Sequence, residues 1–142
     1  MIVLGLTVVL GFGFSCSVAS GTGTSGAGTN STSNALTSTA WRLVKFDGKV
    51  IDSSTFARTP EVRFWVGSKV SGNDGCNLIT GTYSVQGDKI LFGNMAGTKM
   101  ACMNTNYDNY NKFLNRTDKF KVVENTLYFY EGTRELMSYN KK

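Results

Sequence analysis

Two cysteines in the second half of the chain are the residues whose types could support chemistry. Cys76 lies in the stretch SGNDGCNLITGTY (Ser71–Tyr83), and Cys102 follows in MAGTKMACM. A pair of this kind can supply a reactive thiol, hold a metal ion, or form a disulfide. The other residue types in the chain decide between these three roles.

The 142-residue sequence contains no histidine. It therefore lacks the commonest general base and the commonest zinc ligand. Two thiols without CxxC spacing provide too few ligands for a structural zinc site, which needs four nitrogen or sulfur donors. We therefore expect no metal site and no cofactor. Two buried free thiols or a disulfide remain as the roles of the pair.

The carboxylates are the other groups that could act in catalysis. A pair of them can perform acid–base work, as in glycoside hydrolysis. Most lie at expected turns or on expected solvent faces, and their spacing indicates no pairing. We expect no catalytic residues and a chain that is not an enzyme. The ten carboxylates are Asp47, Asp52, Glu61, Asp74, Asp88, Asp108, Asp118, Glu124, Glu131 and Glu135.

Residues 1–15 form an apolar, uncharged run, MIVLGLTVVLGFGFS. This run is shorter than the ~20 residues of a membrane-spanning helix, and it is typical of the apolar part of a signal peptide. Ser15 directly precedes Cys16, which resembles the cleavage box of bacterial lipoproteins. We predict a lipoprotein-type signal peptide and lipidation of Cys16, with an ordinary cleaved signal peptide as the alternative. The protein is then exported to the cell envelope, as an outer-membrane lipoprotein.

Residues 16–39 are predicted to be a flexible tether. All but four of residues 17–40 are Ser, Thr, Gly or Ala, and none is charged. Such a segment cannot bury enough apolar surface to offset its ordering entropy. A coil of this composition spans about 25–30 Å. Residues 40–142, which carry every charge of the chain, are predicted to be the folded domain.

Export favours the disulfide over two free thiols, because paired cysteines tend to close in oxidising compartments. A bond from Cys76 to Cys102 would close a loop of about 27 residues and contribute roughly 3–4 kcal/mol on the chain-entropy model.

The pattern after residue 40 predicts the elements that must position these cysteines. Asp47-Gly48 lies between two apolar runs, which is a strong hairpin signal. Residues 78–92 and 125–139 read as two further hairpins, with turns at Gly87-Asp88 and Glu131-Gly132. Tyr107, Tyr110 and Leu114 recur at helical spacing. We predict an α+β fold, a small and mostly antiparallel β-barrel-like sheet with one covering helix at about residues 105–117.

A set of spaced residues around the two cysteines forms a recognisable pattern: Gly75, Cys76, Asn77, Gly81, Tyr83, Gly87, Asp88, Met95, Ala96, Thr98, Met100, Ala101 and Cys102. Trp41, Pro60 and Phe113-Leu114 agree with it outside this central segment. The pattern resembles that of the META/HslJ domain family, and the resemblance covers residues 40–140.

This resemblance implies a small, barrel-like α+β domain with one helix. Members of the family are often exported or lipoproteins, and some are linked to heat-shock response and antibiotic tolerance. No enzymatic activity is established for the domain. The family pattern marks a set of residues as a structural motif and not as a catalytic site: Gly75, Asn77, Gly81, Tyr83, Met95, Thr98, Met100 and Ala101.

We therefore expect a non-enzymatic, membrane-tethered envelope protein with a META-like domain, acting in stress or antibiotic tolerance. Its partners would be a membrane, through the lipid anchor, and an envelope protein or a small hydrophobic ligand. The alternative is a carrier of a small hydrophobic ligand or lipid in a partly open barrel. An enzyme with paired carboxylates is a third hypothesis. The net charge of +5 is spread along the chain, so we expect no nucleic-acid partner.

Overall fold

The computed structural model describes residues 33–37, 39–103 and 106–142. The predicted signal peptide (residues 1–15), the predicted lipidation site Cys16 and residues 16–32 of the predicted tether lie outside this range. Among the described residues, no helix is both long and apolar enough to cross a membrane. The elements are β1 (Ala40–Phe46), β2 (Lys49–Val50), β3 (Glu61–Trp65), β4 (Lys69–Asn73), β5 (Leu78–Gln86), β6 (Lys89–Gly97), α2 (Tyr107–Arg116), β7 (Lys119–Val123), β8 (Thr126–Glu131) and β9 (Arg134–Lys141).

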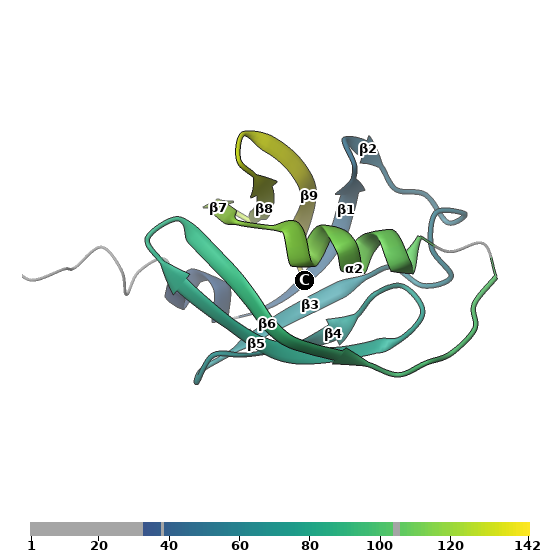
Figure 1. Cartoon of the computed structure of the whole chain (residues 1–142). Coiled ribbons are helices and arrows are strands. Elements are labelled where there is room, and N and C mark those ends of the chain that lie inside the picture. The colour runs from purple at the N-terminus through teal and green to yellow at the C-terminus, as the bar shows by residue number, and fades with distance from the viewer. Residues whose placement is uncertain (1–32, 38, 104–105) are drawn as a thin grey trace, which may run out of the picture.

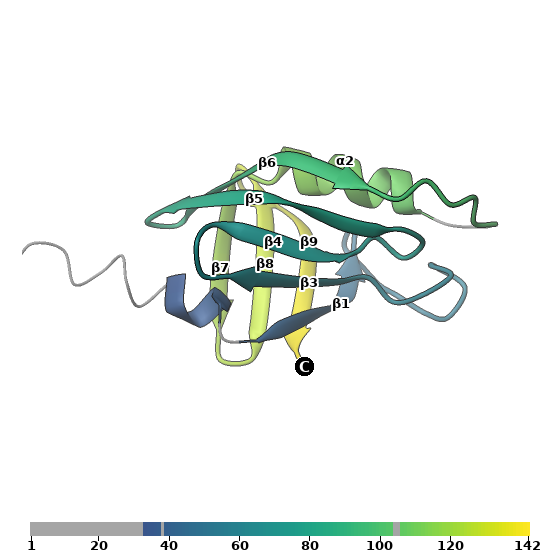
Figure 2. The same cartoon turned by 90° about the horizontal axis from the view of Figure 1, so that it is seen from below.

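The strands form one antiparallel sheet that curls nearly into a barrel (Figures 1 and 2). The sheet order within the described chain is β2-β1-β3-β4-β5-β6-β7-β8-β9, and β1 also pairs with β9. All strands except β2 thus lie on a ring, and β2 extends the sheet beside β1. Strands β3–β6 cross β7–β9 as a second layer in Figure 2. The predicted class, a barrel-like antiparallel sheet with one covering helix, is confirmed.

The predicted turns set the register of the hairpins. Asp47 and Gly48 both have positive φ, 50° and 75°, so they form the tight turn between β1 and β2. Gly87 has φ 64° between β5 and β6, and Gly132 has φ 59° between β8 and β9. In each case the backbone conformation at the turn favours glycine, which is why the sequence signals these turns so clearly.

The interior of the barrel is filled by aromatic side chains that contact one another. The ring of Phe64 lies 4.9 Å from that of Tyr83 in an edge-to-face arrangement. The ring of Phe129 lies 5.6 Å from that of Phe92 and 5.3 Å from that of Tyr139. Edge-to-face pairs at these distances add to the free energy gained from burial. The core is therefore a packed interior contributed by strands from both layers.

The circle of paired strands is least complete between β6 and β7. In the described sheet these strands share a single register pair, Lys89 with Lys119. The backbone N–H of Ile90 donates to the carbonyl of Asp118 at 3.1 Å, close to this pair. Beyond the Lys89–Lys119 pair the two strands separate. Helix α2, which lies between them in the sequence, runs alongside β6 (Figures 1 and 2). Tyr110 and Leu114 of α2 are fully buried, so the helix closes the core where the sheet does not.

The folded domain extends into the segment that the sequence analysis assigned to the tether. Residues 33–37 form a short helix, and the side chain of Leu36 is 0% exposed. The indole N–H of Trp41 donates to the carbonyl of Leu36 at 3.1 Å, which fixes the helix against β1. Leu36 is a single apolar residue among Ser, Thr, Asn and Ala, so composition alone conceals its burial.

Replacing this residue tests whether residues 33–37 belong to the domain. We expect Leu36→Ala to lower the free energy of unfolding by about 2–5 kcal/mol, because it leaves a cavity in the core. Leu91, which is 66% exposed on β6, provides the matched control, and Leu91→Ala should change stability by less than ~0.5 kcal/mol. Urea unfolding measures both values, and equal effects would contradict the assignment.

Two buried tyrosines join α2 to β9. The hydroxyl of Tyr139 donates to that of Tyr110 at 3.0 Å, and both side chains are 0% exposed. Burial raises the pKa of both phenols, and the charge of Asp74 raises that of Tyr110 further. Both hydroxyls thus keep their protons in the folded state at pH values where free tyrosine loses its own.

This pair makes stability depend on pH in the alkaline range. Above pH ~10 the unfolded chain binds fewer protons at these residues than the folded one, so the free energy of unfolding falls as pH rises. We expect Tyr139→Phe to make this fall shallower, because it removes one such group. Urea unfolding at several pH values on both sides of pH ~10 gives the slopes, and parallel curves would exclude this linkage.

Candidate functional site

The loop between β4 and β5 turns sharply, and we refer to residues 73–77 as the corner loop. The side-chain oxygen of Asn73 accepts the N–H of Gly75 at 3.0 Å. Gly75 has φ 96°, and a Cβ there would lie 2.5 Å from the ring of Phe56. Only glycine suits this position, because both the backbone conformation and the close ring exclude a side chain.

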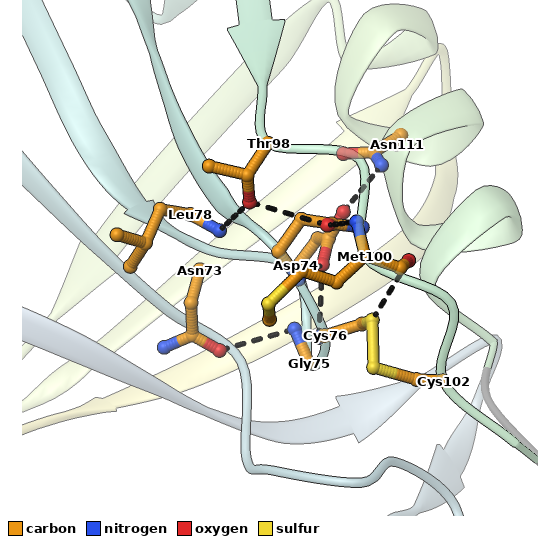
Figure 3. The surroundings of a disulfide bond; sticks show 10 residues. Asn73, Asp74, Gly75, Cys76, Leu78, Thr98, Met100, Cys102 and Asn111 are labelled. Carbon is orange, nitrogen blue, oxygen red and sulfur yellow. Dashed lines mark hydrogen bonds between the residues drawn. A yellow bond between two sulfur atoms is a disulfide. The ribbon is translucent and has the colours of Figure 1, made fainter.

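Asp74 is a buried carboxylate at the centre of the corner loop, and its side chain is oriented towards α2 (Figure 3). The residue is 1% exposed. Its Oδ1 accepts the backbone N–H groups of Cys76 at 2.9 Å and Asn77 at 2.6 Å. Its Oδ2 accepts the side-chain amide of Asn111 on α2 at 2.7 Å. None of the ion pairs among the described residues includes Asp74, so N–H donors alone compensate its burial.

Asn77 connects the corner loop to the segment that follows β6. Its Oδ1 accepts the backbone N–H of Met100 at 2.6 Å and the hydroxyl of Thr98 at 3.2 Å. The same hydroxyl oxygen accepts the N–H of Leu78 at 3.1 Å. Thr98 and Asn77 therefore join two chain segments through both side chain and backbone.

A disulfide joins the same two segments covalently. Cys76 and Cys102 are bonded, with their Cα atoms 5.9 Å apart, which is the usual separation for a disulfide. Cys76 is 4% exposed, so the bond lies against the core at its first cysteine. This is the pairing that export favoured over two free thiols.

The remaining motif residues lie away from the corner loop or along one side of it. Tyr83 belongs to the barrel core, and its hydroxyl donates to the carbonyl of Trp65 at 3.2 Å. A Cβ on Gly81 would lie 2.4 Å from the sulfur of Met95, so glycine allows β5 and β6 to approach closely at their bulge. Met100 and Ala101 are exposed. The structure thus gathers Gly75, Asn77, Thr98 and Met100 at one place and assigns Gly81 and Tyr83 to the strand.

A cleft of about 520 Å³ lies between α2 and the segment after β6. One wall is residues 95–101, the end of β6 and the segment after it, and the other is the face of α2 that carries Tyr107, Asp108, Asn111, Leu114 and Asn115. Asp74 and Asn77 of the corner loop line it as well. The cleft thus occupies the place where β6 and β7 separate.

Asp74 and Asn111 are the site residues that the sequence analysis missed. Asp74 was grouped with carboxylates at turns and solvent faces, but it is buried. Asn111 lies four residues after Tyr107 and three before Leu114, so a polar residue interrupts an apolar helical stripe. This interruption is the signal that could have identified it, because a polar group on a buried face needs a partner.

Asp108 on α2 lines the same cleft as Asp74, and the other carboxylates are dispersed over the surface. Three of them form exposed or half-exposed ion pairs, which contribute little to stability. Within the described residues, no group of three or more Cys, Asp and Glu residues is arranged to hold a metal ion. The pairs are Arg42–Glu61, Arg116–Glu131 and Arg134–Asp47, with Lys142 also on Glu61.

Removal of the buried carboxylate tests its structural role. We expect Asp74→Ala to lower the free energy of unfolding by about 3 kcal/mol or more, because three N–H donors lose a charged acceptor in a buried site. Asp88→Ala, at an exposed turn position, serves as the control and should stay within ~0.5 kcal/mol of the parent. Urea unfolding of the oxidised proteins gives both values, and a small loss for Asp74→Ala would refute the role.

Comparison with known proteins gives the same domain limits as the fold. The chain matches no curated protein. It is similar in structure to a protein from Burkholderia xenovorans solved by NMR, at 21% identity and a TM-score of 0.63, over 79% of this chain and 87% of that one. It is also similar to a DUF4847 family protein from Bacteroides vulgatus, at 14% identity and a TM-score of 0.60, over 77% and 96%.

Structural similarity at such low sequence identity establishes only that these proteins share a fold. The model of the META domain matches residues 34–142, which include the helix at residues 33–37 almost entirely, the barrel and the corner loop. The chain therefore belongs to the META domain family.

Proposed function

We propose that this META domain protein is a non-enzymatic protein of the cell envelope, held at the outer membrane by a lipid on Cys16. The observation that carries the proposal is the Cys76–Cys102 disulfide. Disulfides persist in oxidising compartments and are rare in reducing ones. Together with the apolar run at residues 1–15 and the cysteine that follows it, the bond supports export.

The position of the N-terminal helix is consistent with such an anchor. Ser33, Asn34 and Thr37 line the same surface hollow as residues 66–68, which form the turn between β3 and β4. The corner loop begins at the other end of β4, with Asn73. The N-terminal helix therefore lies near one end of β4, and the corner loop lies at the other end (Figure 1).

The engagement of Asp74 supports a non-enzymatic role. Both of its oxygens accept N–H donors from the corner loop and α2. A carboxylate used in this way holds segments together, and both of its oxygens are engaged within the protein. The resemblance to members linked to heat-shock response and antibiotic tolerance motivates our proposal that the protein acts under envelope stress.

The alternative, a carrier of a hydrophobic ligand inside the barrel, has less support. It would need an interior space, and the interior is occupied by aromatic rings in mutual contact, such as Phe64, Phe92 and Phe129. The cleft beside α2 is a different location and carries polar groups. We therefore retain the non-enzymatic, envelope-tethered protein as the proposed function, with the cleft as its candidate binding site.

Metabolic labelling with an alkyne fatty acid tests the anchor. We expect the protein to incorporate the label in a bacterial host and Cys16→Ala to lose it, because the lipid is attached through that thiol. Ser17→Ala, which changes the neighbouring residue, is the matched control and should keep the label. In-gel fluorescence after coupling to a dye reads the result.

Two results would refute the anchor. An unlabelled parent protein would exclude lipidation, and a Cys16→Ala variant that keeps its label would exclude Cys16 as the attachment site.

A further inference from the structure

The cleft contains a buried amide group that lacks a hydrogen bond. Asn77 is 5% exposed and lines the cleft. Its oxygen is identified by the backbone N–H of Met100, because a backbone donor requires an acceptor. The other terminal atom of the Asn77 carboxamide is then the nitrogen, Nδ2. This nitrogen makes no hydrogen bond within the described part of the chain. Buried polar groups are rarely left in this state, so a missing partner is indicated.

A second carboxamide in the same cleft offers the complementary group. The amide nitrogen of Asn111 donates to Oδ2 of Asp74, which can only accept when ionised. The oxygen of Asn111 therefore points away from Asp74, and it accepts no hydrogen bond from any described residue. The same carboxylate, that of Asp74, holds both residues. Its Oδ1 accepts the backbone N–H of Asn77, and its Oδ2 accepts the side-chain N–H of Asn111.

The rest of the cleft suits a small, neutral ligand. Its volume of about 520 Å³ falls within the ~300–1,000 Å³ of small-molecule sites. Ile79 and Leu114 are buried apolar residues in its lining, and Met100, 53% exposed, offers an adaptable apolar contact. Lys99 and Asp108 also line the cleft, so with Asp74 it carries two carboxylates and one ammonium group, a balance that disfavours an anionic ligand.

We propose that this cleft binds a ligand through a secondary amide group. The carbonyl of the ligand amide accepts from Asn77, and its N–H donates to the oxygen of Asn111. Polypeptide main chains and N-acetylated sugars both carry this group. The inference rests on the proposed role as a binding domain, and it concerns the cleft alone and not the anchor.

Titration of the full-length, ¹⁵N-labelled protein tests the proposal. The probes are N-acetyl-trialanine amide and N-acetylglucosamine, which represent the two sources of the group. We expect at least one probe to shift the side-chain NH₂ signals of Asn77 and Asn111 in a saturable manner. The probe that binds identifies the source. A trisarcosine analogue, which has no backbone N–H between its residues, should bind about tenfold more weakly than trialanine if the peptide is the ligand.

Variants on α2 and beside it separate this site from unspecific binding. We expect Asn111→Ala to weaken binding about tenfold, the effect of one hydrogen bond. Asn109→Ala lies on the exposed side of the same helix and should bind like the parent. Ala101→Trp places a large ring in the cleft and should abolish binding, whereas Ala57→Trp, in an exposed loop, should not.

The outcomes decide the proposal in both directions. No saturable shift with either probe overturns it, and so does an equal loss in Asn109→Ala and Asn111→Ala. If Asn111→Ala fails to fold, Ala101→Trp still decides, because this exposed position has no hydrogen-bonding role in the described structure. Labelling at Cys16 together with an empty cleft would leave the envelope anchor intact and refute the cleft assignment alone.

Discussion

A carboxylate that is buried without a cation must find hydrogen-bond donors on both oxygens, and the arrangement around Asp74 follows from this requirement. Two donors come from the corner loop itself, and the third comes from Asn111 on α2. The turn conformation and the placement of the helix are therefore linked through one side chain. The disulfide and the bonds of Asn77 add the segment after β6 to the same assembly.

This assembly lies where the sheet is least able to close by itself. Strands β6 and β7 share one register pair and then separate, so α2 has to cover the core there. A helix held beside a strand leaves a cleft between them, because the helix cannot continue the hydrogen-bonded ladder of the sheet. The cleft, the disulfide and the buried carboxylate thus lie together beside the incomplete closure of the barrel. Asp74, Asn77 and Asn111, whose hydrogen bonds connect the corner loop, the segment after β6 and α2, also line the cleft.

Much of the fold was predictable from sequence, because turns and helices are encoded locally. Asp47-Gly48, Gly87 and Gly132 mark turns whose backbone favours glycine, and the stripe of Tyr110 and Leu114 marks the helix. Strand β7 was not recognised, since Phe120 lies between two lysines and only its own side chain is fully buried. Leu36 was assigned to the tether for a related reason, because a single apolar residue gives no periodic pattern.

The sequence by itself determined the chemistry that is available: no histidine, two cysteines suited to pairing, and a glycine-rich corner between strands. It also determined the family, through residues spaced along the whole domain. Only the tertiary structure decided that Asp74 is buried, that Asn111 reaches it, and that the buried residue Asn77 lines a cleft. The physical reason is that these contacts join residues 23 to 37 positions apart, and the burial of a polar group depends on which distant segments supply its partners.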